Sequence, residues 1–137
     1  MGLILDSSVV IAAERGGDTP RQLATQIATL AGDQEVALSA VGLTELVHGI
    51  YRADSEERRI HRQQFIDELR AGFTVYPYTD RTALLAGRID GEQKAKGVII
   101  PFSDLLIGAT ALFLGFSIVT VNLRHFRLIP GLNVISM

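Results

Sequence analysis

The stretch that most constrains the fold is residues 105–121, which contain no charged side chain. A helix that is apolar on every side belongs inside a core, so a buried helix is predicted to start near Pro101. Ser103 is a good N-cap candidate, and Gly115 supplies a stop before a buried strand at residues 118–121. The run falls short of the about 20 residues that span a membrane, and Gly115 interrupts it.

One carboxylate, Asp104, lies at the start of this apolar helix. The simplest interpretation is a first-turn acid that is stabilised by the positive end of the helix dipole. The alternative is a metal ligand, because a carboxylate beside a buried helix has to be paired, hydrogen-bonded or bound to a cation. The choice depends on which other polar residues converge on the same place.

The rest of the chain alternates between short apolar strands and helices. Further strands are predicted at residues 2–6, 35–39, 73–76 and 133–135, with a short extended piece at 98–100. Further helices are predicted at 9–13 after a Ser7 or Ser8 cap, 20–31, 40–52, 56–70 and 81–96, with one turn at 122–126. This alternation favours an α/β fold with a mostly parallel central sheet flanked by helices on both sides. With 137 residues and no repeat or linker, the chain is predicted to be a single domain, residues 1–137.

The composition narrows the chemistry. A formal net charge of −2 provides no overall attraction to nucleic acid, so such binding would require a local basic patch. The chain has no cysteine, which excludes disulfides, thiolate zinc sites and cysteine nucleophiles and is compatible with a reducing cytoplasm. The N-terminus runs directly into residues 3–6 without a basic region or cleavage site, so no signal peptide is predicted.

Polar side chains lie at the ends of three predicted strands or directly after them. These residues are Asp6, Ser7, Ser8, Ser39, Thr120 and Asn122. Because ligands in open α/β sheets bind beyond the carboxyl ends of the strands, we expect these oxygens and Asp104 to lie along one edge. Oxygen ligands of this kind are what magnesium and manganese prefer.

Glu45 lies on the predicted helix of residues 40–52, opposite an apolar stripe made of Leu43, Leu46, Val47 and Ile50. The simplest interpretation is a glutamate in water. Gly42 and Gly49 flank it on the same face, however, and each glycine costs a helix about 1 kcal/mol relative to alanine. Close packing would explain these glycines, which favours Glu45 pointing into a crowded site.

Several catalytic motifs are missing from the sequence. It contains neither a G-x-x-x-x-G-K-[ST] phosphate loop nor a G-x-S-x-G nucleophile elbow. His48, His61 and His125 have no spacing suited to zinc, and packing or surface roles are favoured for them. Three separated carboxylates without an obvious base indicate metal-assisted hydrolysis, in which the cation generates the nucleophile.

Four segments resemble motifs of the PIN-domain family, and more narrowly of VapC-like toxins from bacterial toxin–antitoxin systems. They are residues 5–11, 39–49, 101–111 and 119–126, and they occur in the family's order across nearly the whole chain. Each motif is weak alone, whereas four in register are specific. The first three carry the acids Asp6, Glu45 and Asp104.

The resemblance implies a PIN-like three-layer fold and a metal-dependent endoribonuclease. Asp6, Glu45 and Asp104 would hold one Mg²⁺ or Mn²⁺, and a metal-activated water would attack an RNA phosphodiester. Asn122 belongs to the implied catalytic set, at a position where family members often have a fourth acid. An asparagine contributes no negative charge, so one metal or two remains open. The implied residues that orient waters or carboxylates are Ser8 and Thr120.

The resemblance also implies partners. Arg124 and His125 are candidates for contact with RNA phosphate, and a cognate antitoxin would bind at the helix pair 41–52 and 56–70, which carries Leu46, Ile50, Ile60 and Phe65. For a second basic run (Arg58, Arg59, His61 and Arg62), a solvated helix face is favoured. A homodimer, no membrane association and a cytoplasmic location are expected.

Two alternatives remain. The first is a non-catalytic PIN-like module that binds RNA or protein, in which the carboxylates are structural and Asn122 marks a decayed site. The second is a phosphoryl-transfer domain with Asp6 as nucleophile. The second alternative is disfavoured because Ser8 stands where a second aspartate would be expected.

Overall fold

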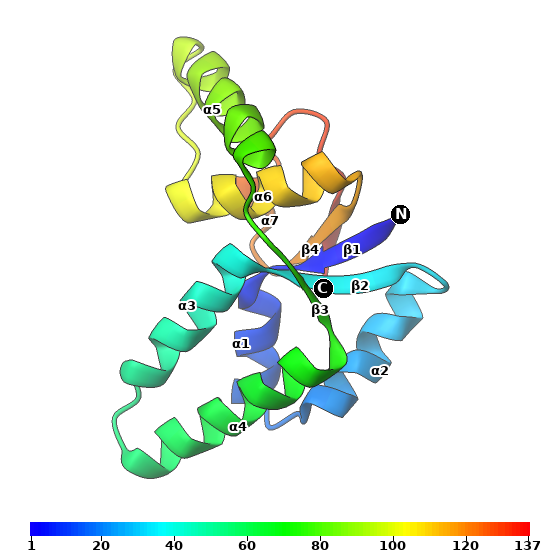
Figure 1. Cartoon of the computed structure of the whole chain (residues 1–137), viewed down its shortest axis with the longest axis vertical. Coiled ribbons are helices and arrows are strands. Elements are labelled where there is room, and N and C mark those ends of the chain that lie inside the picture. Colours follow the sequence, from blue (N-terminus) through cyan, green and yellow to red (C-terminus); the bar gives the residue numbers. More distant parts are fainter.

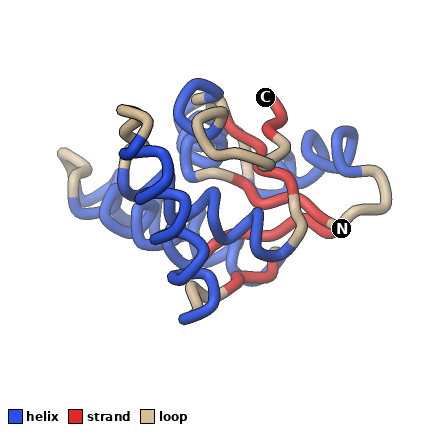
Figure 2. Tube along the Cα trace, turned by 90° about the horizontal axis from the view of Figure 1, so that it is seen from above, coloured by secondary structure: helices blue, strands red, loops and turns tan.

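The computed structural model describes residues 1–137 and is built around a sheet of five parallel strands (Figure 1). The strands are β1 (Gly2–Leu5), β2 (Glu35–Ser39), β3 (Thr74–Tyr76), β4 (Ser117–Thr120) and β5 (Val134–Ser136). Their order is β3-β2-β1-β4-β5, and every neighbouring pair is parallel. Seen from above, the strands run between helices on both sides (Figure 2). The predicted α/β fold with a parallel, helix-flanked sheet is confirmed.

Seven helices connect the strands. They are α1 (Ser7–Arg15), α2 (Pro20–Ala31), α3 (Ala40–Tyr51), α4 (Glu56–Gly72), α5 (Asp80–Ala95), α6 (Phe102–Leu114) and α7 (Leu123–Phe126). The expected extended piece at residues 98–100 is not a strand. Those residues lead from Gly97, with a φ of 79°, to Pro101, which has no N–H for a sheet ladder and starts a helix instead.

The sheet separates two hydrophobic cores because neighbouring side chains on a strand point to opposite faces. Leu3 and Leu5 pack with α1, α2, α3 and α4 on one face. Ile4 packs with α5, α6 and α7 on the other. Each such side chain contributes about 1.5–3 kcal/mol when fully buried. The central strand β1 is therefore fixed from both sides, and so is the residue that follows it.

Helix α6 is the buried helix that the charge-free run predicted. Six of its residues are buried, and Gly115, with a φ of 72°, ends it. A Cβ at Gly108 would collide with the Ile129 side chain, so the glycine allows the segment after α7 to lie close against α6. None of the helices has the length and apolar character needed to cross a membrane.

Two predicted helix caps are wrong. Helix α6 begins at Phe102 with Pro101 as its N-cap, so Ser103 lies in the first turn and its hydroxyl is free for another partner. Helix α1 begins at Ser7, and Asp6 is its N-cap residue without a side-chain cap hydrogen bond. The side chain of Asp6 is instead held by residues distant in sequence. By contrast, Thr19 forms a capping box on α2, as its sequence suggests.

Candidate functional site

Asp6 directly follows β1 and lies beside the neighbouring strand β4. The Asp6 backbone N–H donates to the Val119 carbonyl at 2.9 Å, which continues the pairing of the two strands. Its side-chain Oδ2 accepts hydrogen bonds from Ser8 Oγ at 2.6 Å and Thr120 Oγ1 at 3.0 Å. The other oxygen, Oδ1, is buried and has no hydrogen-bond partner. Such an atom is costly unless a ligand satisfies it.

Glu45 approaches from α3 and is held by two hydroxyls. Ser7 Oγ donates to Oε1 at 2.8 Å, and Ser103 Oγ donates to Oε2 at 3.0 Å. Glu45 thus points toward the starts of α1 and α6 rather than into water. The sequence interpretation missed both serines as partners of Glu45. The sequence does contain a signal for both. Ser7 and Ser103 lie in the first turns of α1 and α6, next to Asp6 and Asp104, which were already assigned to the site.

The two glycines that flank Glu45 differ. A Cβ at Gly42 would lie 3.1 Å from Ser39 Oγ, which agrees with close packing at that position. At Gly49 the space is open, so the close-packing interpretation is wrong there. The Gly49 carbonyl instead accepts a hydrogen bond from Arg62 Nη1 at 2.7 Å.

Asp104 completes the group of acids from the first turn of α6. Its Oδ2 lies 2.7 Å from His125 Nδ1, and Asn122 Nδ2 lies 2.9 Å from the same nitrogen. Burial raises the pKa of the Asp104 carboxyl, and the negative charges of Asp6 and Glu45 raise it further, while His125 opposes the shift. Asp6 and Glu45 are therefore close enough to Asp104 to influence its charge.

The donor set suits a hard divalent cation. The observation that supports this is the unpartnered buried Asp6 Oδ1, in an all-oxygen group of three interacting acids. As they stand, the acids do not gather into a closed group of three ligands. Each is held by its own hydroxyl or imidazole partners, an arrangement that limits the repulsion among three carboxylates without a counter-ion.

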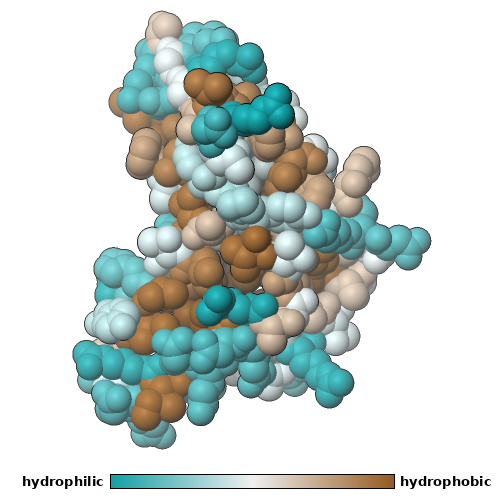
Figure 3. All heavy atoms as spheres, viewed as in Figure 1, coloured by the Kyte–Doolittle hydropathy of each residue, from teal (hydrophilic) through white to brown (hydrophobic).

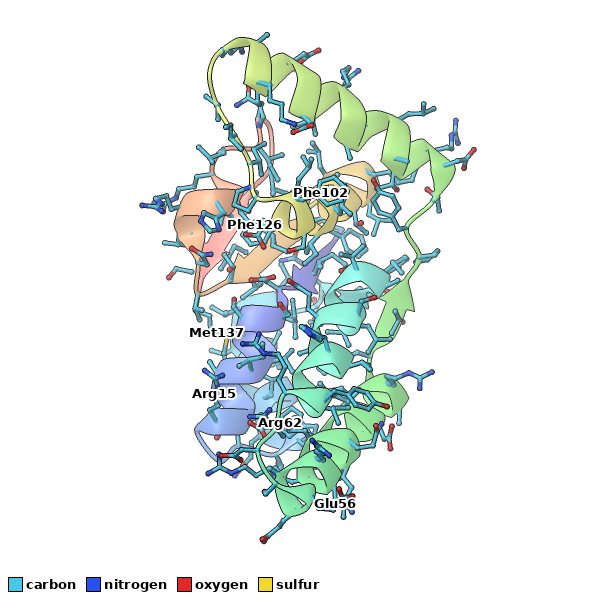
Figure 4. The ribbon with its side chains drawn as sticks, turned by 90° about the vertical axis from the view of Figure 1, so that its left-hand side faces the viewer. Arg15, Glu56, Arg62, Phe102, Phe126 and Met137 are labelled. Carbon is cyan, nitrogen blue, oxygen red and sulfur yellow. The ribbon has the colours of Figure 1, made fainter.

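A groove of about 360 Å³ begins beside Ser7 and Glu45 and runs between α1, α3 and α4. Its basic lining residues are Arg15, His48, Arg52 and Arg62. Arg62 lies 3.6 Å from Glu14, so its charge is partly offset. Figure 4 shows Arg15 and Arg62 near each other, on α1 and α4. Arg58 and Arg59 instead pair with acids on their own exposed surface, in agreement with the favoured solvated face.

The sequence and the fold identify the class of protein. The profile of the PIN domain matches residues 3–132, and the chain belongs to the PIN-domain family. The expected resemblance to this family and to VapC proteins is confirmed.

Curated relatives place the chain among VapC ribonucleases. Ribonuclease VapC1 of Rickettsia felis is 33% identical over all of this chain and 97% of the relative. The tRNA(fMet)-specific endonuclease VapC of Salmonella typhimurium is 31% identical over 100 residues, which cover 72% of this chain and 73% of the relative.

Solved structures agree on the fold. VapBC2 of Rickettsia felis, bound to a DNA fragment from its promoter, contains a chain that superposes with a TM-score of 0.86 at 24% identity. That match covers 100% of this chain and 99% of the other. DNA-bound VapBC of Salmonella typhimurium gives a TM-score of 0.82 at 24% identity, over 99% and 98% of the two chains.

Proposed function

We propose that this chain is a toxin endoribonuclease that hydrolyses RNA phosphodiester bonds with Mg²⁺ or Mn²⁺ held by Asp6, Glu45 and Asp104. The observation that carries the proposal is the buried Asp6 Oδ1, which has no protein partner and belongs to a group of three interacting acids. The names of the VapC relatives support ribonuclease activity. A bound divalent cation would lower the pKa of a water molecule and offset the charge that develops on the phosphate.

The residues of the chain prepare the site for that cation. Ser8 and Thr120 donate to Asp6 Oδ2, so the carboxylate cannot rotate freely and its Oδ1 stays available. Ser7 and Ser103 fix both oxygens of Glu45, and a carboxylate oxygen that accepts one hydrogen bond retains capacity for a further ligand. Because the acids repel RNA when no cation is present, basic residues have to attract it. The exposed Arg124 lies within the fourth motif and is our candidate for phosphate contact.

The first substrate to test is transfer RNA. The Salmonella relative is named for tRNA(fMet), and its similarity covers most of this chain. Transfer RNA would place the activity in the cytoplasm.

We further propose that a cognate antitoxin binds along the groove between α1, α3 and α4. Leu46 and Phe65 line its apolar part, and Ile60 on α4 is half-exposed. Figure 3 shows hydrophobic surface over the region of α3 and α4, bordered by hydrophilic residues. The similar solved structures from Rickettsia felis and Salmonella typhimurium are of VapBC2 and VapBC. A partner segment in this groove would end beside Glu45 and block access to the acids.

A homodimer is proposed at the opposite end of the molecule. The side chains of Leu84, Ile99 and Phe102 are 76%, 74% and 71% exposed, and that of Phe113 is 42% exposed. These apolar side chains belong to α5, α6 and the segment between them. A second copy would remove this surface from water at a gain of about 25 cal/mol per Å².

The second candidate function is a non-catalytic PIN-like module that binds RNA or protein. It is favoured by one observation, namely that the three acids do not close into a metal-binding cluster as they stand. It predicts binding without cleavage and no effect of Mn²⁺ on thermal melting.

The test is cleavage of tRNA(fMet) and total RNA by the purified chain with Mn²⁺, beside Asp6→Asn, Glu45→Gln and Asp104→Asn variants. The expected result is cleavage that EDTA abolishes and that each variant loses. Asp33→Asn and Glu68→Gln serve as matched controls because both residues are exposed and remote in sequence from the motifs. Cleavage that survives in the Asp6, Glu45 and Asp104 triple variant would contradict the proposal.

A further inference from the structure

Asn122 and His125 form a chain of contacts that ends on Asp104. His125 Nδ1 lies 2.7 Å from Asp104 Oδ2, and the Asn122 side-chain amide lies 2.9 Å from the same ring nitrogen. The backbone N–H of Asn122 donates to Thr120 Oγ1 at 2.9 Å, which fixes the start of this turn beside Asp6. The side chain of Asn122 is thus engaged with the imidazole rather than with an acid.

The packing of α7 against α6 holds this geometry. Phe126, next to His125, is completely buried, and Gly108 on α6 provides the space that the segment after α7 needs. Helices α6 and α7 contact each other, and the Phe126 ring lies against Gly108 of α6. The His125 ring therefore faces the first turn of α6, where Asp104 lies.

The chemistry of the groups decides the direction of the contact. An ionised carboxylate can only accept, so Nδ1 has to carry the hydrogen and donate it to Asp104 Oδ2. A hydrogen bond to a charged acceptor is stronger than one between neutral groups. Since Nδ1 already carries a hydrogen, it cannot accept one from the Asn122 NH₂ group, so the Asn122 amide has to be turned over and accept from the same Nδ1–H through its Oδ1, which restricts rotation of the ring. One oxygen of Asp104 is then held by the imidazole, and the carboxylate plane is fixed relative to Asp6.

We propose that His125 and Asn122 are positioning residues for Asp104, and that Asn122 acts through the His125 ring rather than binding the cation itself. The inference rests on the proposed metal site. It assigns the site one cation held by three carboxylates, and it gives Asn122, at the position where the resemblance places a fourth acid, no direct contact with that cation.

The first experiment is a double-mutant cycle on Mn²⁺ affinity, measured by calorimetry on the full-length chain. Partners that orient metal ligands typically contribute 10–100-fold in affinity, so Asn122→Ala and His125→Ala should each weaken binding by about tenfold or more. Because both act on one oxygen, the double variant should bind no more weakly than His125→Ala alone. Losses that multiply in the double variant would show that Asn122 acts independently and would overturn the proposal.

Two further variants sharpen the cycle. Asn122→Asp should still bind one Mn²⁺ per chain, whereas a stoichiometry of two would identify position 122 as a ligand site and overturn the proposal. Asn133→Ala and His61→Gln are matched controls, since the side chain of Asn133 bonds only to Ser117 and the side chain of His61 on α4 is exposed. Both controls should leave the Mn²⁺ affinity unchanged. Melting in EDTA verifies that each variant folds.

A second measurement requires no metal. The ring nitrogens of His125 are observed by ¹⁵N NMR in the metal-free chain and assigned by the loss of their signals in His125→Gln. The wild type should show a protonated Nδ1 that donates a hydrogen bond, and Asp104→Ala should shift the ring toward the Nε2–H tautomer. An unchanged His125 signal in Asp104→Ala would overturn the contact chain. If the wild type binds no Mn²⁺, the proposed metal site fails, and this measurement alone decides whether His125 holds Asp104.

Discussion

The acids at the β1–β4 edge and the charges on α4 show how the same side-chain types behave in two environments. On α4, Arg58 pairs with Asp54 at 3.5 Å and Arg59 with Glu56 at 3.9 Å, with both partners exposed to water. At the sheet edge, two of the three acids are held only by neutral hydroxyls, and Asp104 alone has a basic partner. The α4 charges are paired without a ligand, whereas at the sheet edge Asp6 and Glu45 carry negative charge and have no basic partner.

The largest expected effect is on catalysis at the sheet edge. Asp6→Asn removes a negative charge from the site and should lower the rate of RNA cleavage by about a thousandfold or more, because the cation supplies several kcal/mol of transition-state stabilisation. The measurement is the initial rate on tRNA(fMet) with Mn²⁺. On α4, Glu68→Gln should leave the rate unchanged. Equal losses in both variants would remove the distinction between the two regions.

Cation binding should stabilise the fold by mass action. At a Mn²⁺ concentration of 100 times the dissociation constant, the gain in unfolding free energy is about 2.7 kcal/mol. Thermal melting of the wild type should therefore rise with Mn²⁺, and melting of Asp104→Asn should not. If neither protein responds across millimolar Mn²⁺, the non-catalytic module becomes the better description.

The two serines that hold Glu45 should matter more for activity than for stability. Ser103→Ala removes the donor to Oε2, and Ser7→Ala removes the donor to Oε1. Partners that orient metal ligands typically contribute 10–100-fold, so we expect cleavage to fall about tenfold or more when Glu45 loses its orientation. Ser55→Ala, which removes the α4 cap, is the control that should lower the melting temperature without a matching loss of rate.

Removing charge at the edge should also stabilise the metal-free protein. The pKa of Asp104 is raised in the folded state above its ordinary 3.8, mainly by burial. Between 3.8 and the raised pKa the folded state binds more protons than the unfolded state, so stability falls as pH rises through that window. Asp104→Asn should therefore be more stable than the wild type at neutral pH in EDTA.

The advantage of Asp104→Asn should disappear in acid, when the wild-type carboxyl is protonated in both states. Urea unfolding of both proteins between about pH 3, below the ordinary pKa of 3.8, and about pH 7 measures this dependence. A difference in stability that stays constant with pH would show that Asp104 carries no charge penalty.

The smallest effect is expected on α4. Arg58→Gln breaks an exposed ion pair with Asp54, and exposed pairs contribute about 0–1 kcal/mol. Urea unfolding should detect a change within about 0.5 kcal/mol, and cleavage should be unaffected. A large loss of activity would instead assign Arg58 to RNA contact and erase the contrast between the two regions.

Local sequence determined much of the fold. The predicted bounds of the strand at Glu35–Ser39 and the helix at Pro20–Ala31 match β2 and α2. Apolar periodicity, proline and glycine act over a few residues, so their effects can be predicted from the local sequence alone. The same local patterns placed Asp6 as the last residue of a strand and Asp104 in the first turn of a buried helix. In the structure Asp6 directly follows β1, and Asp104 lies in the first turn of α6.

Only the tertiary structure decided which side chains meet. Ser7 and Ser103 reach Glu45 across 38 and 58 residues, and Thr120 reaches Asp6 across 114. The hydroxyl of Ser103 looked like a cap because its local sequence suits a cap, yet Pro101 starts the helix and leaves that hydroxyl for Glu45. Local propensity describes a residue and its neighbours, whereas strand order and helix packing fix the partners of a side chain, and these depend on the whole chain.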